Sequence, residues 1–249
     1  MVGAIIPAAG RGERLGRRDA KAFVPIAGVP LIIHTLRAFE AARSVRRVVV
    51  AVRASDRGRM RQLLRRWRIR KVGAVVEGGV SRSASVARGL AVLPPALRLV
   101  VVHDAARCCV TPRLIDAAVA AARRHGAVVT GEPAHATVKA VDEQAAVRLT
   151  LDRHALWFAQ TPQVFRRDWF VDALARAGAD LSQFPDDAAI LEWAGYPVRM
   201  IAGDSLNIKV TTPGDLILAE TILKVRNAEC GMRNKTISLR TPNSALRTV

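Results

Sequence analysis

Short runs of β-branched and other apolar residues alternate with segments of helical periodicity along the first half of the chain. The runs predicted as buried strands are residues 2–6, 45–52, 71–76, 98–102 and 126–130. The segments predicted as helices are residues 31–42, 56–67, 81–93 and 112–124. Strict alternation of strands and helices produces a parallel sheet, because each crossover must pass over one of its faces. The sequence therefore predicts an α/β fold, a Rossmann-like and mostly parallel sheet with helices on both faces.

The loop after the first strand is built for close approach of a ligand. Residues 7–12 read Pro-Ala-Ala-Gly-Arg-Gly, and Arg14 and Lys21 follow. Small residues leave backbone N–H groups bare, so that they can point into an anion site. Leu15 stands where a dinucleotide fingerprint needs its third glycine, and no Gly-Lys-Ser/Thr sequence closes a P-loop. The loop therefore belongs to neither of these two motif classes, but its bare backbone and the cations that follow suit a polyphosphate ligand.

Three predicted loops fall at the carboxyl ends of strands, where open parallel sheets bind their ligands. They are the loop 8–16, the Gly78-Gly79 turn and the segment that begins at His103 and Asp104. A polyphosphate needs a divalent cation, and the Asp104 carboxylate is a suitable hard oxygen ligand. His103 is interpreted as a packed histidine beside the site. The sequence has no Gly-x-Ser-x-Gly nucleophile elbow, so direct displacement is expected.

The second half of the chain changes pattern. Residues 132–151 predict a β-hairpin arm, which would be unstable alone and is therefore expected to pack on a partner subunit. A strand edge or loop is expected over 157–165, helices over 168–177, 186–194 and 213–223, and a strand over 198–202. Residues 1–223 are expected to form one domain, followed by a flexible basic tail, 224–249.

Composition sets limits on location and partners. The chain has 39 basic and 21 acidic residues, a net charge of +18, which would fit a nucleic-acid partner. The arginines are spread along the whole chain and aromatic residues are only 4%, which favours a generally basic surface over a nucleic-acid module. No apolar run is long enough to span a bilayer, and no signal peptide is recognised, so a cytoplasmic location is expected.

Several motifs in order carry a family resemblance over residues 2–223. They are Ala8-Ala9-Gly10-x-Gly12-x-Arg14 with Lys21, Gly78-Gly79-x-x-Arg82-x-x-Ser85, His103-Asp104-Ala105-Ala106-Arg107, Asp152-Arg153, Thr161-Pro162-Gln163 and Asn207-Ile208-Lys209-Val210-Thr211. Together they resemble the 2-C-methyl-D-erythritol 4-phosphate cytidylyltransferase (IspD) family, within the nucleotidyltransferases of glycosyltransferase-A-like fold.

The resemblance implies a Mg²⁺-dependent reaction of CTP with methylerythritol 4-phosphate in the non-mevalonate isoprenoid pathway. By resemblance, Arg14 and Lys21 stabilise charge on the α-phosphate and the leaving pyrophosphate, and Asp104 binds Mg²⁺. The residues implied to contact CTP are Ala8, Ala9, Gly10, Gly12, Gly79, Arg82 and Ser85. Those implied to hold the polyol phosphate are Arg107, Thr137, Arg153, Thr161 and Lys209, with Arg153 and Lys209 directed at its phosphate. The resemblance also implies a homodimer, in which the hairpin that holds Thr137 would reach across and complete the site of the other subunit.

One close alternative shares the fold and the CTP site. A ribitol-5-phosphate cytidylyltransferase would differ in its polyol pocket, and Ala136 and Pro185 depart from the family pattern on that side. The identity of the polyol phosphate therefore stays open at this point.

Overall fold

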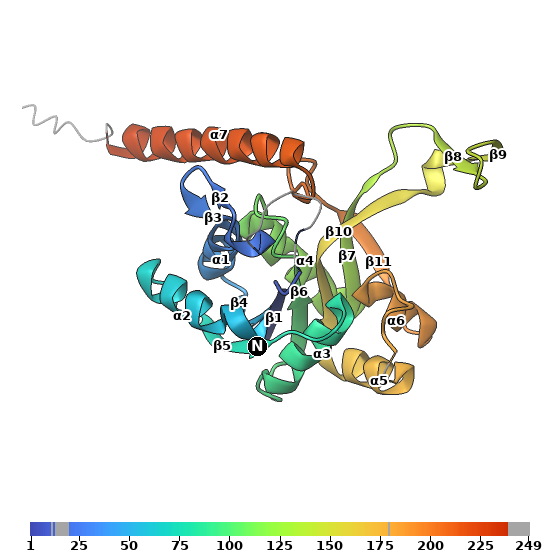
Figure 1. Ribbon diagram of the computed structural model, residues 1–249, viewed down its shortest axis with the longest axis horizontal. Helices are drawn as coiled ribbons and strands as arrows, with labels where there is room; N and C mark the ends of the chain where they lie inside the picture. Colours follow the sequence, from blue (N-terminus) through green and yellow to red (C-terminus); the bar gives the residue numbers. More distant parts are fainter. Residues whose placement is uncertain (11, 13–19, 179, 239–249) are drawn as a thin grey trace, which may run out of the picture.

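A seven-stranded sheet forms the centre of the molecule in the computed structural model, which describes residues 1–10, 12, 20–178 and 180–238 (Figure 1). Its strand order is β11-β7-β10-β6-β1-β4-β5. All neighbouring pairs are parallel except those made by β10, which runs antiparallel to both β6 and β7. The strands are β1 (Val2–Pro7), β4 (Val45–Val52), β5 (Val72–Glu77), β6 (Leu99–Val102), β7 (Ala127–Pro133), β10 (Trp157–Arg166) and β11 (Arg199–Ala202). The predicted α/β class is confirmed.

Helices cover both faces of this sheet. One face carries α1 (Leu31–Ala41), α2 (Arg57–Arg66) and α4 (Pro112–His125), and the other carries α3 (Arg82–Val92), α5 (Arg167–Ala177) and α6 (Asp187–Trp193). The side chains of β1 alternate between the two: Ala4 and Ile6 join the first core, and Ile5 joins the second. Burial on both faces explains why the central strands read as continuous apolar runs.

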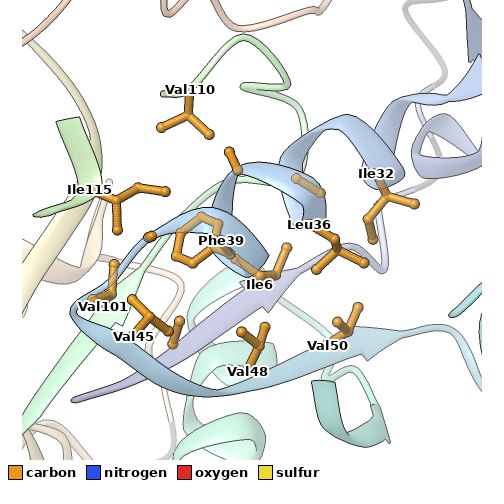
Figure 2. Close-up of a cluster of buried hydrophobic side chains, with 14 of the residues drawn as sticks. Ile6, Ile32, Leu36, Phe39, Val45, Val48, Val50, Val101, Val110 and Ile115 are labelled. Carbon is orange, nitrogen blue, oxygen red and sulfur yellow. The ribbon is translucent and has the colours of Figure 1, made fainter. Parts of the chain in front are cut away.

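The core under α1 shows how the first layer is held (Figure 2). Leu36 and Phe39 lie one turn apart on α1 and are fully buried against Ile6 of β1 and Val48 of β4. Residues three or four apart share a helix face, so this spacing gives α1 one apolar stripe. Replacing a buried Phe such as Phe39 by Ala costs about 3–5 kcal/mol.

The hairpin arm leaves the main sheet and projects from the body (Figure 1). It consists of β8 (Val138–Val141) and β9 (Val147–Leu151), which pair only with each other among the described strands. A second small hairpin is formed by β2 (Pro25–Ile26) and β3 (Val29–Pro30), and short 3₁₀ helices occur at η2 (Lys21–Phe23), η3 (Ala54–Asp56) and η4 (Arg153–Ala155). The expected hairpin is confirmed as a structural element.

Two expectations were wrong. The segment expected as a strand edge or loop over 157–165 is β10, an interior strand between β6 and β7. The last helix, α7 (Pro213–Ser238), does not end at residue 223 but continues for several turns. The rest of the expected tail, residues 239–249, lies outside the described part of the chain. Across that described part, no helix combines the length and apolarity needed to cross a membrane.

Candidate active site

A cavity of about 390 Å³ opens at the carboxyl ends of β1, β5 and β6. Strand β1 has β4 on one side and β6 on the other, so the chain leaves it in one direction and later returns on the opposite side. This is a point of strand-order reversal, where open α/β sheets bind ligands. The cavity is lined by Pro7, Ala8, Ala9, Gly10, Lys21, Ala22, Leu31, Gly79, Val80, Ser81, Arg82, Ser85, Asp104, Ala105, Ala106 and Lys209.

The loop after β1 forms one wall of this cavity. Its start is fixed because the Ala8 N–H donates to the Ala51 carbonyl oxygen at 2.7 Å, which extends the pairing with β4. Gly12 has a φ of +74°, and a Cβ atom there would lie 2.6 Å from the Cβ of Lys21. Only glycine fits this position without strain. Gly12 therefore lies directly against Lys21, which begins η2 and lines the cavity.

The Gly78-Gly79 turn after β5 forms the neighbouring wall, because a Cβ atom on Gly78 would lie 2.5 Å from the Cβ of Ala9. A Cβ atom on Gly79 would lie 2.5 Å from the Cβ of Ala84, so the turn can lie against α3 only as glycine. The Gly79 N–H donates to Ser85 Oγ at 3.0 Å, and that hydroxyl donates to the Ser81 carbonyl at 2.9 Å. Ser81 caps α3 by accepting from the Ala84 N–H at 3.1 Å. Ser85 thus fixes the turn in addition to lining the cavity.

Three ionic side chains meet at the floor. The carboxylate of Asp104 accepts from Arg82 Nε and from Lys209 Nζ, both at 2.7 Å. Burial alone would raise the pKa of Asp104, but the two adjacent positive charges more than offset it and hold that pKa well below its usual range. Arg82 also donates to the buried carboxylate of Asp187 at 2.5 Å. Asp104 is therefore ionised at neutral pH, and its charge orders two cations that face the cavity.

His103 and Thr161 support Asp104 from behind. Thr161 Oγ1 accepts from the Asp104 N–H at 3.1 Å and lies 3.0 Å from His103 Nδ1. His103 Nε2 lies 3.2 Å from the Arg107 carbonyl oxygen, which can only accept, so this nitrogen carries the proton. Burial lowers the pKa of His103 to about 4 despite the nearby Asp104. The imidazole is neutral at pH 7 and packs on Phe39, as the sequence interpretation expected.

The structure brings together most of the residues predicted to hold CTP and the metal, but of those predicted for the polyol phosphate only Lys209 joins them. Ala8, Ala9, Gly10, Lys21, Gly79, Arg82, Ser85, Asp104 and Lys209 line the one cavity. Thr161 is buried behind it. The Arg107 guanidinium donates to the backbone carbonyls of Asn207 at 2.8 Å and Ala159 at 3.2 Å. The predicted contact of these two side chains with substrate stays a prediction.

Thr137 and Arg153 lie away from the cavity, at the base of the arm. Both are exposed, and Arg153 donates to the His135 carbonyl oxygen at 3.0 Å. Within a single chain, neither side chain lines the cavity. Arg14, the other predicted catalytic cation, lies outside the described residues.

The donor set fits a magnesium ion that is shared with a substrate. Within the described ranges, no three His, Cys, Asp or Glu side chains gather as a metal cage. Asp104 is the carboxylate that faces the cavity. Mg²⁺ is commonly held by one or two carboxylates together with water and substrate phosphates, so the single carboxylate in this lining is compatible with such a shared ion.

Sequence reasoning missed the supporting role of Asp187 and Asn207. Asp186 caps α6 by accepting from the Ala189 N–H at 2.9 Å, whereas Asp187 points back to Arg82. Asn207 is fully buried and donates to the Thr161 carbonyl oxygen at 2.8 Å. The pair Asp186-Asp187 signals a helix start, but nothing local shows that the second carboxylate pairs with an arginine 105 residues away.

Solved structures with the same architecture define the class of protein. The crystal structure of 2-C-methyl-D-erythritol 4-phosphate cytidylyltransferase from Thermus thermophilus aligns with a TM-score of 0.72 and 35% identity, over 89% of this chain and 98% of that one. The 4-diphosphocytidyl-2C-methyl-D-erythritol synthase of Anaerococcus prevotii aligns with a TM-score of 0.78 and 26% identity, over 90% of this chain and 98% of that one. With its cavity at the strand-order reversal, the chain is a nucleotidyltransferase of the α/β class.

The sequence comparisons then give the family. The family model described as 2-C-methyl-D-erythritol 4-phosphate cytidylyltransferase matches residues 2–225. The protein of that name from Pelotomaculum thermopropionicum is 42% identical over 92% of this chain and 98% of its own length. The one from Geobacillus kaustophilus is 41% identical over 91% and 98%. The chain belongs to the 2-C-methyl-D-erythritol 4-phosphate cytidylyltransferase family.

Proposed function

We propose that this chain transfers the cytidylyl group of CTP to 2-C-methyl-D-erythritol 4-phosphate. The products are 4-diphosphocytidyl-2-C-methyl-D-erythritol and pyrophosphate, in the synthesis of isoprenoid precursors. The observation that carries the proposal is the cavity in which the bare loop 8–10 faces Lys21, Arg82 and the Asp104–Lys209 pair. Family membership favours this polyol phosphate over ribitol 5-phosphate.

The chemistry is a direct displacement at phosphorus. A phosphate oxygen of the polyol substrate forms a bond to the α-phosphorus of CTP, and the bond from that phosphorus to the bridging oxygen of the β-phosphate breaks. Pyrophosphate leaves with the bonding electron pair. The protein needs no covalent intermediate for such a step, because positioning and charge neutralisation lower the barrier.

Each wall of the cavity has a task in this step. The N–H groups of Ala9 and Gly10 face the triphosphate, and the Lys21 ammonium neutralises charge that grows on the α-phosphate and the leaving pyrophosphate. The turn at Gly79, with Arg82 and Ser85, holds the cytosine and ribose side. Lys209 orients the phosphate of the attacking substrate while Asp104 fixes the Lys209 ammonium.

Magnesium is part of the proposal. When bound beside Asp104 and the triphosphate, Mg²⁺ would supply additional neutralisation of phosphate charge. Asp104 suits this role because its carboxylate is ionised and faces the cavity. We place the enzyme in the cytoplasm, where nucleoside triphosphates are made.

We further propose that the enzyme is a homodimer joined through the hairpin arm. Facing pairs Val138–Leu151 and Ala140–Leu149 give the hairpin one apolar face, and Leu149 is 56% exposed in the single chain. A two-stranded hairpin is at best marginally stable in water, so burial of this face against a second copy would stabilise it. The arm would then carry Thr137 and Arg153 toward the polyol pocket of the partner.

The direct test is a substrate matrix with the purified protein. Pyrophosphate release is measured with CTP, ATP, GTP or UTP, each paired with 2-C-methyl-D-erythritol 4-phosphate or ribitol 5-phosphate in the presence of Mg²⁺. The proposal predicts rapid release only for CTP with methylerythritol phosphate. Turnover with ribitol 5-phosphate and none with methylerythritol phosphate would contradict it.

A further inference from the structure

A second and larger cavity lies at the opposite edge of the sheet from the active site, and we name it the basal cavity. Its volume is about 1470 Å³, and it is lined where β1, β6 and β7 begin and where β10 ends. Because β10 is antiparallel, its last residues and the start of α5 reach this edge. Backbone hydrogen bonds fix the arrangement: Arg98 N–H to Met1 O at 3.0 Å, Arg167 N–H to Arg98 O at 2.9 Å and Arg166 N–H to Gly126 O at 2.8 Å.

The side chains around the basal cavity are strongly basic. Arginines come from the starts of β6 and α5 and from the ends of α4 and β10, namely Arg98, Arg123, Arg124, Arg166 and Arg167. The acids of the cavity are already engaged. Asp168 accepts from Arg166 Nε at 3.0 Å, and Asp172 accepts from the Tyr196 hydroxyl at 2.8 Å and lies 3.4 Å from Arg176. Four arginines are left without a carboxylate partner among the described residues.

Helix electrostatics explains only part of this charge. Arg123 and Arg124 are in the last turn of α4, where the helix dipole favours a cation. Arg167 is the first residue of α5, where the dipole disfavours a cation. Its Nη1 atom is buried and has no hydrogen-bond partner within the described chain. A buried guanidinium nitrogen without a partner costs free energy. The Arg167 side chain as a whole is half-buried and lines the basal cavity, so this strained cation lies at its edge.

We propose that the basal cavity binds a small oligophosphate anion, a diphosphate or triphosphate, separate from the catalytic site. Phosphoryl oxygens accept several N–H donors at once and match the fork of a guanidinium, so several arginines can share two or three phosphates. The site is concave and has apolar walls at Leu97 and Leu99, which favours a bounded ligand over a long polymer. This inference does not depend on the proposed reaction, because it concerns binding at the far edge of the sheet.

Calorimetric titration with inorganic tripolyphosphate at physiological salt tests the proposal by counting sites. The variant Arg98→Gln/Arg124→Gln removes two exposed basal arginines. The control Arg61→Gln/Arg65→Gln removes two exposed arginines of α2 that line a separate cavity, together with Arg68 and Arg70. We expect wild type and the α2 variant to bind one more equivalent of tripolyphosphate per chain than the basal variant. If the basal variant keeps this equivalent, its affinity for it should be at least tenfold lower than in wild type. The rate of pyrophosphate release should stay at the wild-type value in both variants.

The proposal would be overturned if all three proteins bound tripolyphosphate with equal stoichiometry and affinity. It would also be overturned if the α2 variant lost as much affinity for tripolyphosphate as the basal variant, because diffuse positive charge alone would then explain the binding. A single-stranded RNA that binds through the basal arginines and resists displacement by tripolyphosphate would overturn it in favour of a nucleic-acid surface. Competition by pyrophosphate or by CTP would support it and would tell whether the site takes a free oligophosphate or a nucleotide.

Thermal unfolding of Arg167→Met gives an independent readout. Without ligand, this variant should unfold at the same or a higher temperature than wild type, because the unpartnered buried nitrogen is gone. Tripolyphosphate should then raise the midpoint of wild type more than that of the variant. An equal ligand-induced rise in both proteins would contradict a role for Arg167.

Discussion

At the scale of single residues, the candidate active site is organised by one carboxylate. Asp104 is buried and ionised, and it holds Arg82 and Lys209 by contacts of 2.7 Å each. The cations therefore stand in fixed positions before any substrate arrives, which is the condition for electrostatic stabilisation without reorganisation. Lys21 lines the same cavity and lies directly against Gly12, where a Cβ atom would come within 2.6 Å of the Lys21 Cβ.

Lys21→Ala should lower kcat about 100- to 1000-fold, because a donor that faces developing phosphate charge is lost. The fold should be retained, since the side chain lines a cavity. Steady-state pyrophosphate release together with circular dichroism measures both quantities. Lys224→Ala is the matched control, because that ammonium lies on α7 and pairs with Glu220. Similar rates in the two variants would show that Lys21 takes no part in the step.

Asp104→Asn should raise the Mg²⁺ concentration for half-maximal rate by about tenfold or more, because the carboxylate oxygen that fits the metal is lost. The variant also leaves Arg82 and Lys209 without their shared anion, so its free energy of unfolding should fall. A magnesium titration of the initial rate measures the first effect, and urea unfolding measures the second. A lower stability with an unchanged magnesium response would assign Asp104 a structural role only.

At the scale of elements, the apolar strands and amphipathic helices were predictable and β10 was not. Residues 45–52 were expected as a strand from their β-branched run, and β4 has those bounds. In β10 the polar residues Gln160, Thr161 and Gln163 are buried, and Pro162 interrupts the pattern. Their partners, such as Asp186 for Gln163 at 2.7 Å, come from distant segments. A polar strand becomes recognisable as interior only when those tertiary hydrogen bonds are known.

The start of α7 makes a pH-dependent prediction. Asp215 accepts from the backbone N–H groups of Thr211 at 2.7 Å and Thr212 at 2.8 Å. Burial opposes its ionisation, but these hydrogen bonds outweigh it and lower the pKa of Asp215 from 3.8 to about 2. Its stabilising contribution is therefore complete above pH 3.8 and is lost as the pH falls toward 2.

Asp215→Asn should destabilise the protein by about 1 kcal/mol at pH 7, the usual value for a lost helix-start contact. The difference in unfolding free energy from wild type should be constant between pH 8 and pH 5 and should shrink by about half near pH 3. Urea unfolding of both proteins across this range measures it. A difference that grows as the pH falls would contradict the assignment.

The arm makes a prediction about assembly. Val147→Asp/Leu149→Asp places charge on two side chains that are 59% and 56% exposed in the single chain, so folding should be unaffected. If they are buried between two copies, the dimer should dissociate and activity should fall with it. Light scattering coupled to size exclusion measures the mass. Thr150→Asp, at an alternate position of the same strand, is the control and should remain dimeric, because it leaves the Arg148–Asp142 ion pair of the arm intact.

At the scale of the whole molecule, the topology of the sheet brings together residues that are far apart in the sequence. The residues that line the active site come from segments as distant as Pro7 and Lys209, and motif order made this site predictable before the structure. The arginines appeared evenly dispersed in the sequence. In the fold, the starts of parallel strands and the end of β10 bring several of them to one basal cavity. Their clustering could not be read from composition, because it depends on which strand ends share an edge.

The account depends most on where the triphosphate binds. A crystal structure with CTP and Mg²⁺ tests this directly. We expect the phosphates to lie against the backbone N–H groups of the loop 8–12, beside Lys21, with Mg²⁺ near Asp104 and the cytosine next to Gly79. Triphosphate density at another place, with this loop and Lys21 free of ligand, would contradict the account.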